Sequence, residues 1–509
     1  MYLRAGVLSL GFLILSRVLG LLRESAQAAA FGATGLGDAV IVMFTLPDLL
    51  VSILISGALS YVLLPVWAQQ NPAQLQHGQR RVARALLAGG VLLGVLVWLL
   101  REPIGHALAP GLQGEMRALG AASLGWSALV LPMAMLAALW VTRLQHERDF
   151  VGMYAGSLFV NGLLVVGLLA ASSGIAGKGT DSAAASMMIL GVALLLAMLA
   201  RLLWLYWRHP QAMPSVTNQT PVSTAATLPG ISVWVWAAMS SGLLLLLPLL
   251  GRSLASQSGE GSLANFNYAW KLVELPLVLA IQLVASLAFP AITRTQPASP
   301  ERREALQMAF VLAWALACAA IAVVASFSLP LARLLFGWGQ MSDSNLLVIA
   351  QWSAAGIWSL LPQALIAVVL TVVAISQQMH LAVWVYGAGV LALGLAGWLG
   401  LANGDGMAGG LAVMWALNFV LASVACVLLF SQRAIVKGSL PFAAMAAPLL
   451  VCLLLTRLRP LLPDMSLPLS AVFAAFFAAL VLGSAALASS QLRGLAAKLL
   501  GRTSAGIAR

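Results

Sequence analysis

Fourteen long apolar stretches limit what this chain can fold into. A helix needs about 20 apolar residues to cross the hydrocarbon core of a bilayer, and each stretch is close to that length or longer. Only 8% of the 509 residues are charged, whereas soluble domains carry about 25%. Period-two alternation is absent, so the sequence predicts an all-α integral membrane protein with about 14 transmembrane helices. The stretches lie near residues 5–30, 38–68, 82–100, 119–142, 151–172, 183–207, 230–251, 262–292, 305–328, 345–374, 381–401, 408–431, 440–457 and 467–489.

The distribution of Lys and Arg explains the net charge of +12. With an even number of helices and both termini placed in the cytoplasm, 17 of these residues fall on the inner side and 7 on the outer side. This bias sets orientation in multi-pass membrane proteins. The basic charge therefore follows from topology and suits an anionic inner leaflet, and no nucleic-acid partner is predicted.

Two segments on either side of a Pro-, Ser- and Thr-rich linker resemble each other. Residues 38–65 and 267–290 each carry Leu-Pro in the first half, at Pro47 and Pro276, then a run of small residues and an aliphatic-Pro ending. Internal repeats with helices interrupted at matching places are typical of alternating-access transporters. We predict helix breaks at Pro47 and Pro276, and a bend or break near Gly20. Chance similarity between apolar helices is the alternative.

Ionisable residues inside the stretches are the candidate functional groups. Arg17, Arg23 and Lys271 would each cost roughly 2.5–3.5 kcal/mol at the centre of a bilayer, so they must face a wet cavity or a partner. Arg17 and Glu24 share a face of a continuous helix, as do Lys271 and Glu274. Two interpretations stay open: internal ion pairs that fix helix packing, or a basic cavity. A guanidinium offers a fork that suits phosphate oxygens, so a basic cavity would attract a diphosphate.

The sequence offers no catalytic constellation. The five His residues are scattered through loops without ligand spacing, and neither a Ser-His-Asp arrangement nor a pair of carboxylates on adjacent turns is present. No complete P-loop occurs, which argues against ATP as a direct energy source. We predict a transporter rather than an enzyme, with no metal and no cofactor. A membrane glycosyltransferase or ligase, a cation-coupled drug exporter and a non-transporting scaffold are the rival interpretations.

Several motifs resemble those of one family of membrane proteins. They are SRVLGLLRE at Ser16–Glu24, FGATGLGDA at Phe31–Ala39, LPDLL at Leu46–Leu50, GALSYVLLP at Gly57–Pro65, WKLVELP at Trp270–Pro276 and LLFGWG at Leu334–Gly339. Together with the count of fourteen helices, these motifs are similar to the signature of the MurJ/MviN family. The family comprises lipid II flippases of the multidrug/oligosaccharidyl-lipid/polysaccharide exporter superfamily.

The resemblance implies a two-lobed architecture. Two pseudo-symmetric six-helix lobes would enclose an inward-facing cationic cavity, and two C-terminal helices would form a groove for an isoprenoid tail. The implied location is the bacterial cytoplasmic (inner) membrane, crossed many times, with both termini cytoplasmic. The implied parts are an N-terminal lobe at 1–208, a cytoplasmic linker at 209–229, a C-terminal lobe at 230–432, and helices 13 and 14 with a basic cytoplasmic tail at 433–509.

The resemblance also implies which residues bind the substrate. Arg17, Arg23 and Asp38 match functional cavity residues of the family. Lys271 stands where the family usually has Arg, and Glu274 matches its acidic partner.

The function that the resemblance implies is translocation of a polyprenyl-diphosphate-linked saccharide, lipid II first, from the inner to the outer leaflet by alternating access. Membrane lipids and the cell-wall or polysaccharide synthesis machinery are the implied partners. Coupling to the membrane potential and coupling to a monovalent cation both stay open. The chain has Val51-Ser52 where the family typically has Arg-Arg. It has Ser56-Gly57 where the family typically continues with Ala-Glu-Gly. These departures make a lipid-linked exopolysaccharide or O-antigen repeat unit the alternative cargo.

Overall fold

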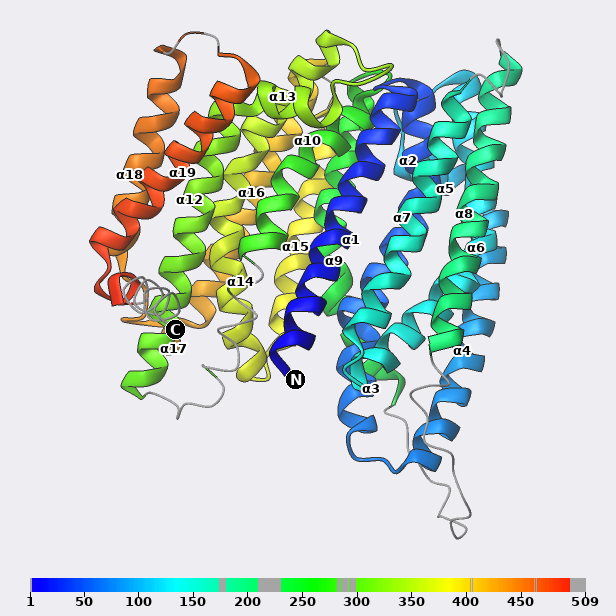
Figure 1. The fold of residues 1–509 in the computed structure, drawn as a ribbon, viewed down its shortest axis with the longest axis horizontal. Helices are drawn as coiled ribbons and strands as arrows, with labels where there is room; N and C mark the ends of the chain where they lie inside the picture. The colour runs from blue at the N-terminus through cyan, green and yellow to red at the C-terminus, as the bar shows by residue number, and fades with distance from the viewer. Residues whose placement is uncertain are drawn as a thin grey trace. The chain divides into compact units, whose positions relative to one another are not determined.

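The chain divides into two compact units, which are described separately. Unit 1 comprises Met1–Ala264 and Phe336–Ser342, and unit 2 comprises Asn265–Leu335 and Asp343–Arg509. Within the described ranges every regular element is a helix (Figure 1). The computed structural model describes residues 2–173, 180–208, 230–281, 284, 292, 299–402, 404, 406–461, 463 and 465–494.

Unit 1 is organised around the long helix α6, which contacts α2, α3, α4, α5, α7 and α8. The helix α1 lies against α7, and α7 lies against α8. The elements of unit 1 are α1 (Tyr2–Phe31), α2 (Gly35–Ile53), the π-helix η1 (Leu54–Ala58), α3 (Leu59–Trp67), α4 (Pro72–Leu99), α5 (Arg101–Leu108), α6 (Gly114–His146), α7 (Phe150–Ser172), α8 (Thr180–Arg208), α9 (Ile231–Ala255), the 3-10 helix η3 (Ser256–Ser258) and the start of α10 (Ser262–Pro276).

In unit 2, α16 contacts α13, α14 and α15, and the two last long helices, α18 and α19, stand side by side (Figure 1). The elements of unit 2 are the remainder of α10, the π-helix η4 (Leu277–Ile281), α12 (Pro300–Phe336), α13 (Asp343–Gly356), the 3-10 helix η5 (Ile357–Ser359), α14 (Leu360–Ile375), α15 (Met379–Trp398), α16 (Met407–Ser431), α17 (Arg433–Val436), α18 (Phe442–Leu458), the 3-10 helix η6 (Arg459–Leu461) and α19 (Leu467–Ala488).

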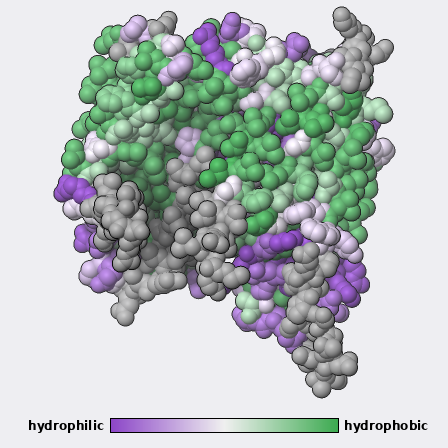
Figure 2. Space-filling model, viewed as in Figure 1, coloured by the Kyte–Doolittle hydropathy of each residue, from purple (hydrophilic) through white to green (hydrophobic). Residues whose placement is uncertain are grey.

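The helices confirm the predicted fold class. Twelve helical segments of the described part are long and apolar enough to span a membrane. The predicted stretches near 5–30 and 262–292 are helical in their described residues, as α1 and as α10 with η4. Figure 2 shows a largely hydrophobic visible surface, with hydrophilic residues gathered toward the ends of the helices. Large apolar side chains such as Leu92 on α4 and Leu203 on α8 are exposed, as contact with lipid requires.

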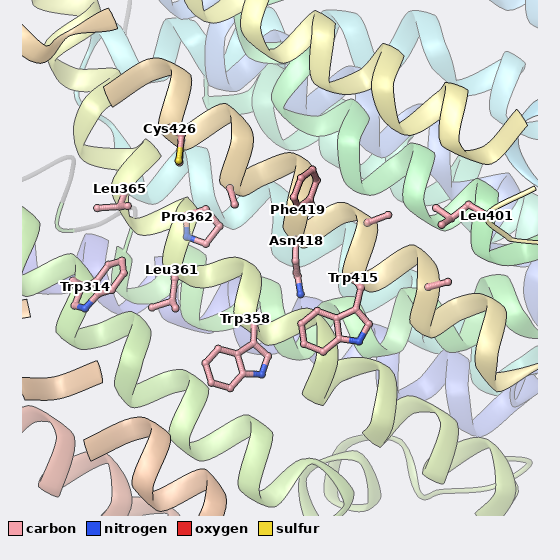
Figure 3. Close-up of a pocket in the computed structure, with 14 residues that line it drawn as sticks. Trp314, Trp358, Leu361, Pro362, Leu365, Leu401, Trp415, Asn418, Phe419 and Cys426 are labelled. Atoms are coloured by element: carbon pink, nitrogen blue, oxygen red, sulfur yellow. The ribbon is translucent and has the colours of Figure 1, made fainter. Parts of the chain in front are cut away.

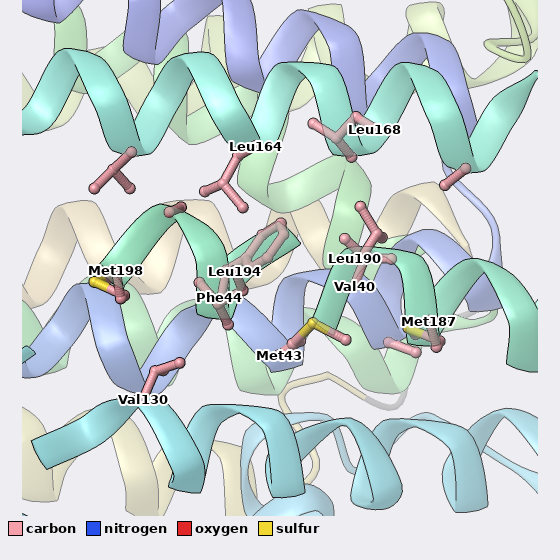
Figure 4. Packing of buried hydrophobic residues seen from close by; sticks show 14 of the residues in the cluster. Val40, Met43, Phe44, Val130, Leu164, Leu168, Met187, Leu190, Leu194 and Met198 are labelled. Carbon is pink, nitrogen blue, oxygen red and sulfur yellow. The ribbon is translucent and has the colours of Figure 1, made fainter. Parts of the chain in front are cut away.

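The core of unit 1 is a cluster of apolar side chains from α2, α6, α7 and α8 (Figure 4). Phe44 of α2 and Leu164 of α7 are among its buried members, and Met187 and Leu194 contribute from α8. Because lipid tails are as apolar as these side chains, close van der Waals packing holds such helices together. This packing sets the positions of the charged residues that α1, α2 and α8 carry.

The division into units differs from the predicted lobes in the position of α9. The helix was expected in the C-terminal lobe, but it packs with η1, α2, α3 and α5 of unit 1. Arg252 Nη2 donates to Thr45 Oγ1 at 2.7 Å, and Ser253 Oγ donates to the carbonyl oxygen of Ala107 at 2.6 Å. These contacts group α9 with unit 1, and the predicted lobe boundaries stay a prediction. The predicted linker at 209–229 lies outside the described residues.

The predicted helix breaks have different outcomes. Pro276 is the last residue of α10, and the π-helix η4 begins at the next residue. Pro47 lies inside α2, which continues to Ile53 before the π-helix η1 begins. At Gly20 no break is found, because α1 runs through it without interruption, and a bend there stays a prediction. Glycine can adopt helical dihedrals at a cost of only about 1 kcal/mol relative to Ala, so it permits a break without causing one.

Candidate functional site

The Arg23 guanidinium lies within a charged cluster of unit 1. Arg23 Nη2 donates to Glu24 Oε1 at 2.9 Å and to Asp48 Oδ2 at 3.2 Å. The side chains of Arg23 and Glu24 are 12% and 8% exposed, whereas that of Asp48 is 50% exposed. The guanidinium also lies over the ring of Phe44, 5.9 Å from its centroid. Arg23 therefore has two carboxylate partners and adds no uncompensated positive charge.

Arg201 of α8 is a further buried cation that the sequence analysis did not single out. It is 7% exposed, and the carboxylate of Asp48 is close enough to act on its guanidinium electrostatically. Its Nε is buried without a hydrogen-bond partner among the described residues. The signal was available, because Arg201 lies inside the predicted stretch 183–207. Arg23, Glu24, Asp48 and Arg201 are called the paired-charge cluster below.

Arg17 differs from the two other arginines. It is exposed on α1, and no hydrogen bond or ion pair to it is found among the described residues. Glu24, which the spacing placed on the same helix face, pairs with the adjacent Arg23 instead. Arg17 lies near enough to Tyr154 of α7 to act on its phenol electrostatically. The neighbouring Ser16 Oγ lies 2.6 Å from Ser157 Oγ, so α1 is tied to α7 at this level.

Asp38 contacts backbone amides rather than arginines. It is 2% exposed in the first turn of α2, and its carboxylate accepts hydrogen bonds from Gly261 N at 2.9 Å and Ala264 N at 2.7 Å. In return, Glu260 Oε1 accepts from Gly35 N at 3.0 Å. Each carboxylate thus serves the N-terminus of the other's helix, where unpaired amides and the helix dipole favour negative charge. We call Asp38, Glu260 and the amides that they bind the end clamp.

Two glycines allow the backbone to close around the end clamp. Gly261 has φ +77°, and a Cβ there would lie 2.1 Å from the carbonyl oxygen of Ala33. Gly339 has φ +60°, and a Cβ there would lie 2.2 Å from the carbonyl oxygen of Ala29. The next residue, Gln340, donates its N–H to that same Ala29 oxygen at 2.8 Å. The segment Phe336–Ser342 therefore caps the end of α1, which is why it belongs to unit 1.

Lys271 and Glu274 form the ion pair that their spacing predicted. Lys271 Nζ donates to Glu274 Oε2 at 2.9 Å on α10 in unit 2. The two side chains are 27% and 37% exposed, so both retain access to solvent or ligand. The pairing is confirmed, and a role in binding substrate stays a prediction.

Unit 2 also contains an apolar cavity of about 840 Å³ between α12, α14 and α16 (Figure 3). Trp314, Trp358, Trp415 and Phe419 contribute aromatic rings to its lining. Asn418, 9% exposed, donates from Nδ2 to the carbonyl oxygen of Ala355 at 2.8 Å. The lining suits a hydrocarbon chain better than a charged ligand.

No group of three or more His, Cys, Asp or Glu side chains that could hold a metal ion is found among the described residues. Among the arginines described above, Arg23 already faces two carboxylates, whereas Arg17 is exposed and has no such partner among the described residues. An exposed guanidinium can hold an anion through charge-assisted hydrogen bonds, without covalent chemistry.

Comparison with known proteins gives one family. The family model described as "Lipid II flippase MurJ" matches residues 27–463. A probable lipid II flippase MurJ of Rhizobium meliloti is 26% identical over 362 residues, which are 66% of this chain and 63% of that protein. A lipid II flippase MurJ of Burkholderia cenocepacia is 24% identical over 368 residues, which are 67% of each chain. The match thus spans less than two thirds of the length of the Rhizobium meliloti relative.

Solved structures share the fold. A structure of the lipid II flippase MurJ in an inward closed conformation superposes with a TM-score of 0.77 at 15% identity, covering 93% of this chain and 98% of the other. An inward-facing multidrug resistance transporter of the MATE family and the MOP superfamily gives a TM-score of 0.63 at 15% identity, over 83% and 94% of the chains. Since the family model covers most of the sequence, the chain belongs to the MurJ family.

Proposed function

We propose that this protein moves lipid II, a polyprenyl-diphosphate-linked saccharide, from the inner to the outer leaflet of the bacterial cytoplasmic membrane. Membership of the MurJ family supports the class of cargo. The observation that carries the proposal is Arg17, an exposed guanidinium on a membrane helix with no partner among the described residues. Such a group is costly in a bilayer unless it faces water and a ligand, and its fork suits diphosphate oxygens.

The proposed mechanism is alternating access without covalent change to the cargo. The diphosphate binds Arg17 from the inner side, the helices rearrange, and the head group leaves on the outer side while the tail stays in lipid. The apolar cavity of unit 2 would take part of a hydrocarbon chain. With both termini cytoplasmic, the membrane potential would bias movement of charge by about 2.3 kcal/mol per elementary charge per 100 mV. A monovalent cation is the other candidate for coupling.

Complementation tests the cargo. The chain is expressed in cells depleted of their own lipid II flippase, and growth and lysis are scored. We expect rescue, because the proposed cargo is the one that these cells fail to move. Failure to rescue, with the protein shown to be in the membrane, would contradict lipid II transport and direct the search to lipid-linked exopolysaccharide or O-antigen repeat units.

Substitution of Lys271 separates binding from packing in unit 2. We expect Lys271→Arg to keep or improve rescue, because a guanidinium contacts phosphate through two N–H groups where an ammonium acts as a point charge. Lys271→Ala should reduce rescue more than it lowers the thermal midpoint of the purified protein. Glu274→Gln is the matched control, because it removes the ion pair and keeps the cation. If Lys271→Ala and Glu274→Gln lower the midpoint equally and leave rescue intact, the pair only supports packing.

A further inference from the structure

We propose that Asp48 is an internal counter-anion, which pairs with Arg23 of the paired-charge cluster until the diphosphate of the cargo replaces it. This inference rests on the proposed function, because the diphosphate is its cargo. It assigns to Asp48 the role of a competitor for the binding groups rather than that of a ligand contact.

The placement of Asp48 suits exchange. Its side chain is 50% exposed, whereas the Arg23 side chain that it contacts is 12% exposed. The carboxylate therefore approaches the buried guanidinium from the exposed side. Its contact with Arg23 at 3.2 Å is also longer than the 2.9 Å contact that Glu24 makes. Of the two carboxylates on Arg23, Asp48 is the more exposed, and it can leave while Glu24 stays on the guanidinium.

The arginines have donors that Asp48 does not use. The Nε atoms of Arg23 and Arg201 are buried and have no hydrogen-bond partner among the described residues. A guanidinium carries five N–H donors in a fixed fork. A diphosphate offers more acceptor oxygens and more negative charge than one carboxylate, so it can satisfy donors that Asp48 leaves unpaired. The exchange also leaves Glu24 in place as the permanent partner of Arg23.

A second Asp–Arg pair in unit 1 shows what a structural pair looks like. Arg208 Nε donates to Asp149 Oδ2 at 2.6 Å, and Arg208 Nη2 donates to Asp149 Oδ1 at 3.4 Å. Asp149 also accepts from Gly152 N at 2.9 Å and so caps α7. Asp48 makes neither a second bond to Arg23 nor a cap among the described residues. Asp149 is held by three bonds, while Asp48 is held by one.

Binding of a diphosphate by the purified full chain tests the inference. The probes are undecaprenyl diphosphate in detergent and inorganic diphosphate. We expect Asp48→Asn to bind both about three- to fivefold more tightly than the unsubstituted protein, because a half-exposed ion pair no longer competes. Arg201→Gln should bind both more weakly. Asp149→Asn, the same change in the structural pair, should leave affinity unchanged.

Equal or weaker binding by Asp48→Asn would overturn the inference, since Asp48 would then orient Arg23 for the ligand. If Asp48→Asn is poorly folded, Asp48→Ser is measured in its place, and we expect it to bind both probes more tightly as well. Complementation separates the two proposals. If the unsubstituted chain rescues the depleted cells but Asp48→Asn does not bind the probes more tightly, only the counter-anion is rejected. Tighter binding by Asp48→Asn, combined with failure of the unsubstituted chain to rescue the depleted cells, rejects lipid II transport and supports the counter-anion. Absence of binding to either probe by every variant rejects the counter-anion.

Discussion

Arg17→Ala is expected to abolish rescue of cells that lack their own lipid II flippase. The substitution removes an exposed guanidinium that has no partner among the described residues, so it costs the folded protein no ion pair. It does remove charge-assisted hydrogen bonds to a diphosphate, and affinity should fall about 10- to 100-fold. Growth of the depleted cells and binding of undecaprenyl diphosphate by the purified protein measure the effect.

The matched control for Arg17 is Arg84→Ala. Arg84 is also an exposed arginine of unit 1, on α4, and it is not one of the groups proposed to bind the diphosphate. Arg84→Ala should leave rescue and binding unchanged. Arg17→Lys should keep part of both, because a lysine supplies the positive charge but not the forked guanidinium. Intact rescue by Arg17→Ala, with normal amounts of protein in the membrane, would show that this guanidinium is not needed for transport.

Asp38→Ala is expected to destabilise the protein strongly. The carboxylate is buried and is the acceptor for Gly261 N and Ala264 N. Its removal leaves two amides at the start of α10 without that acceptor, at a cost of roughly 3 kcal/mol. A lower thermal midpoint of the purified protein would report this loss. Rescue should fall as well, because the end clamp joins the beginnings of α2 and α10.

Asp343→Ala is the control for Asp38. Asp343 also lies in the first turn of a helix, α13, but its side chain is 86% exposed and its nearest contact to Arg333 is 3.9 Å. Its loss should change the midpoint little. Asp38→Asn keeps one acceptor oxygen, so its thermal midpoint should lie between those of Asp38→Ala and Asp343→Ala. A midpoint for Asp38→Ala equal to that of Asp343→Ala would mean that the end clamp adds nothing to stability.

Local sequence decided much of the fold and one part of the candidate site. Transmembrane helices satisfy their backbone hydrogen bonds within one segment, so length and apolarity suffice to find them. This is why the predicted stretches coincide with helices such as α6 and α16. The Lys271–Glu274 pair was predictable for the same reason, because three residues along one helix bring two side chains together.

Tertiary structure decided the partners of the remaining charges. Asp48 contacts Arg23 from another helix. The Asp38 carboxylate accepts hydrogen bonds from amides more than 220 residues further along the chain. No periodicity encodes such pairings, because they depend on how helices pack, and packing between apolar helices in lipid follows shape rather than hydrophobicity. The same holds for α9, which joins unit 1 through contacts that its composition does not reveal. The sequence by itself determined that the charges must be satisfied, and the packing of the helices decided by which groups.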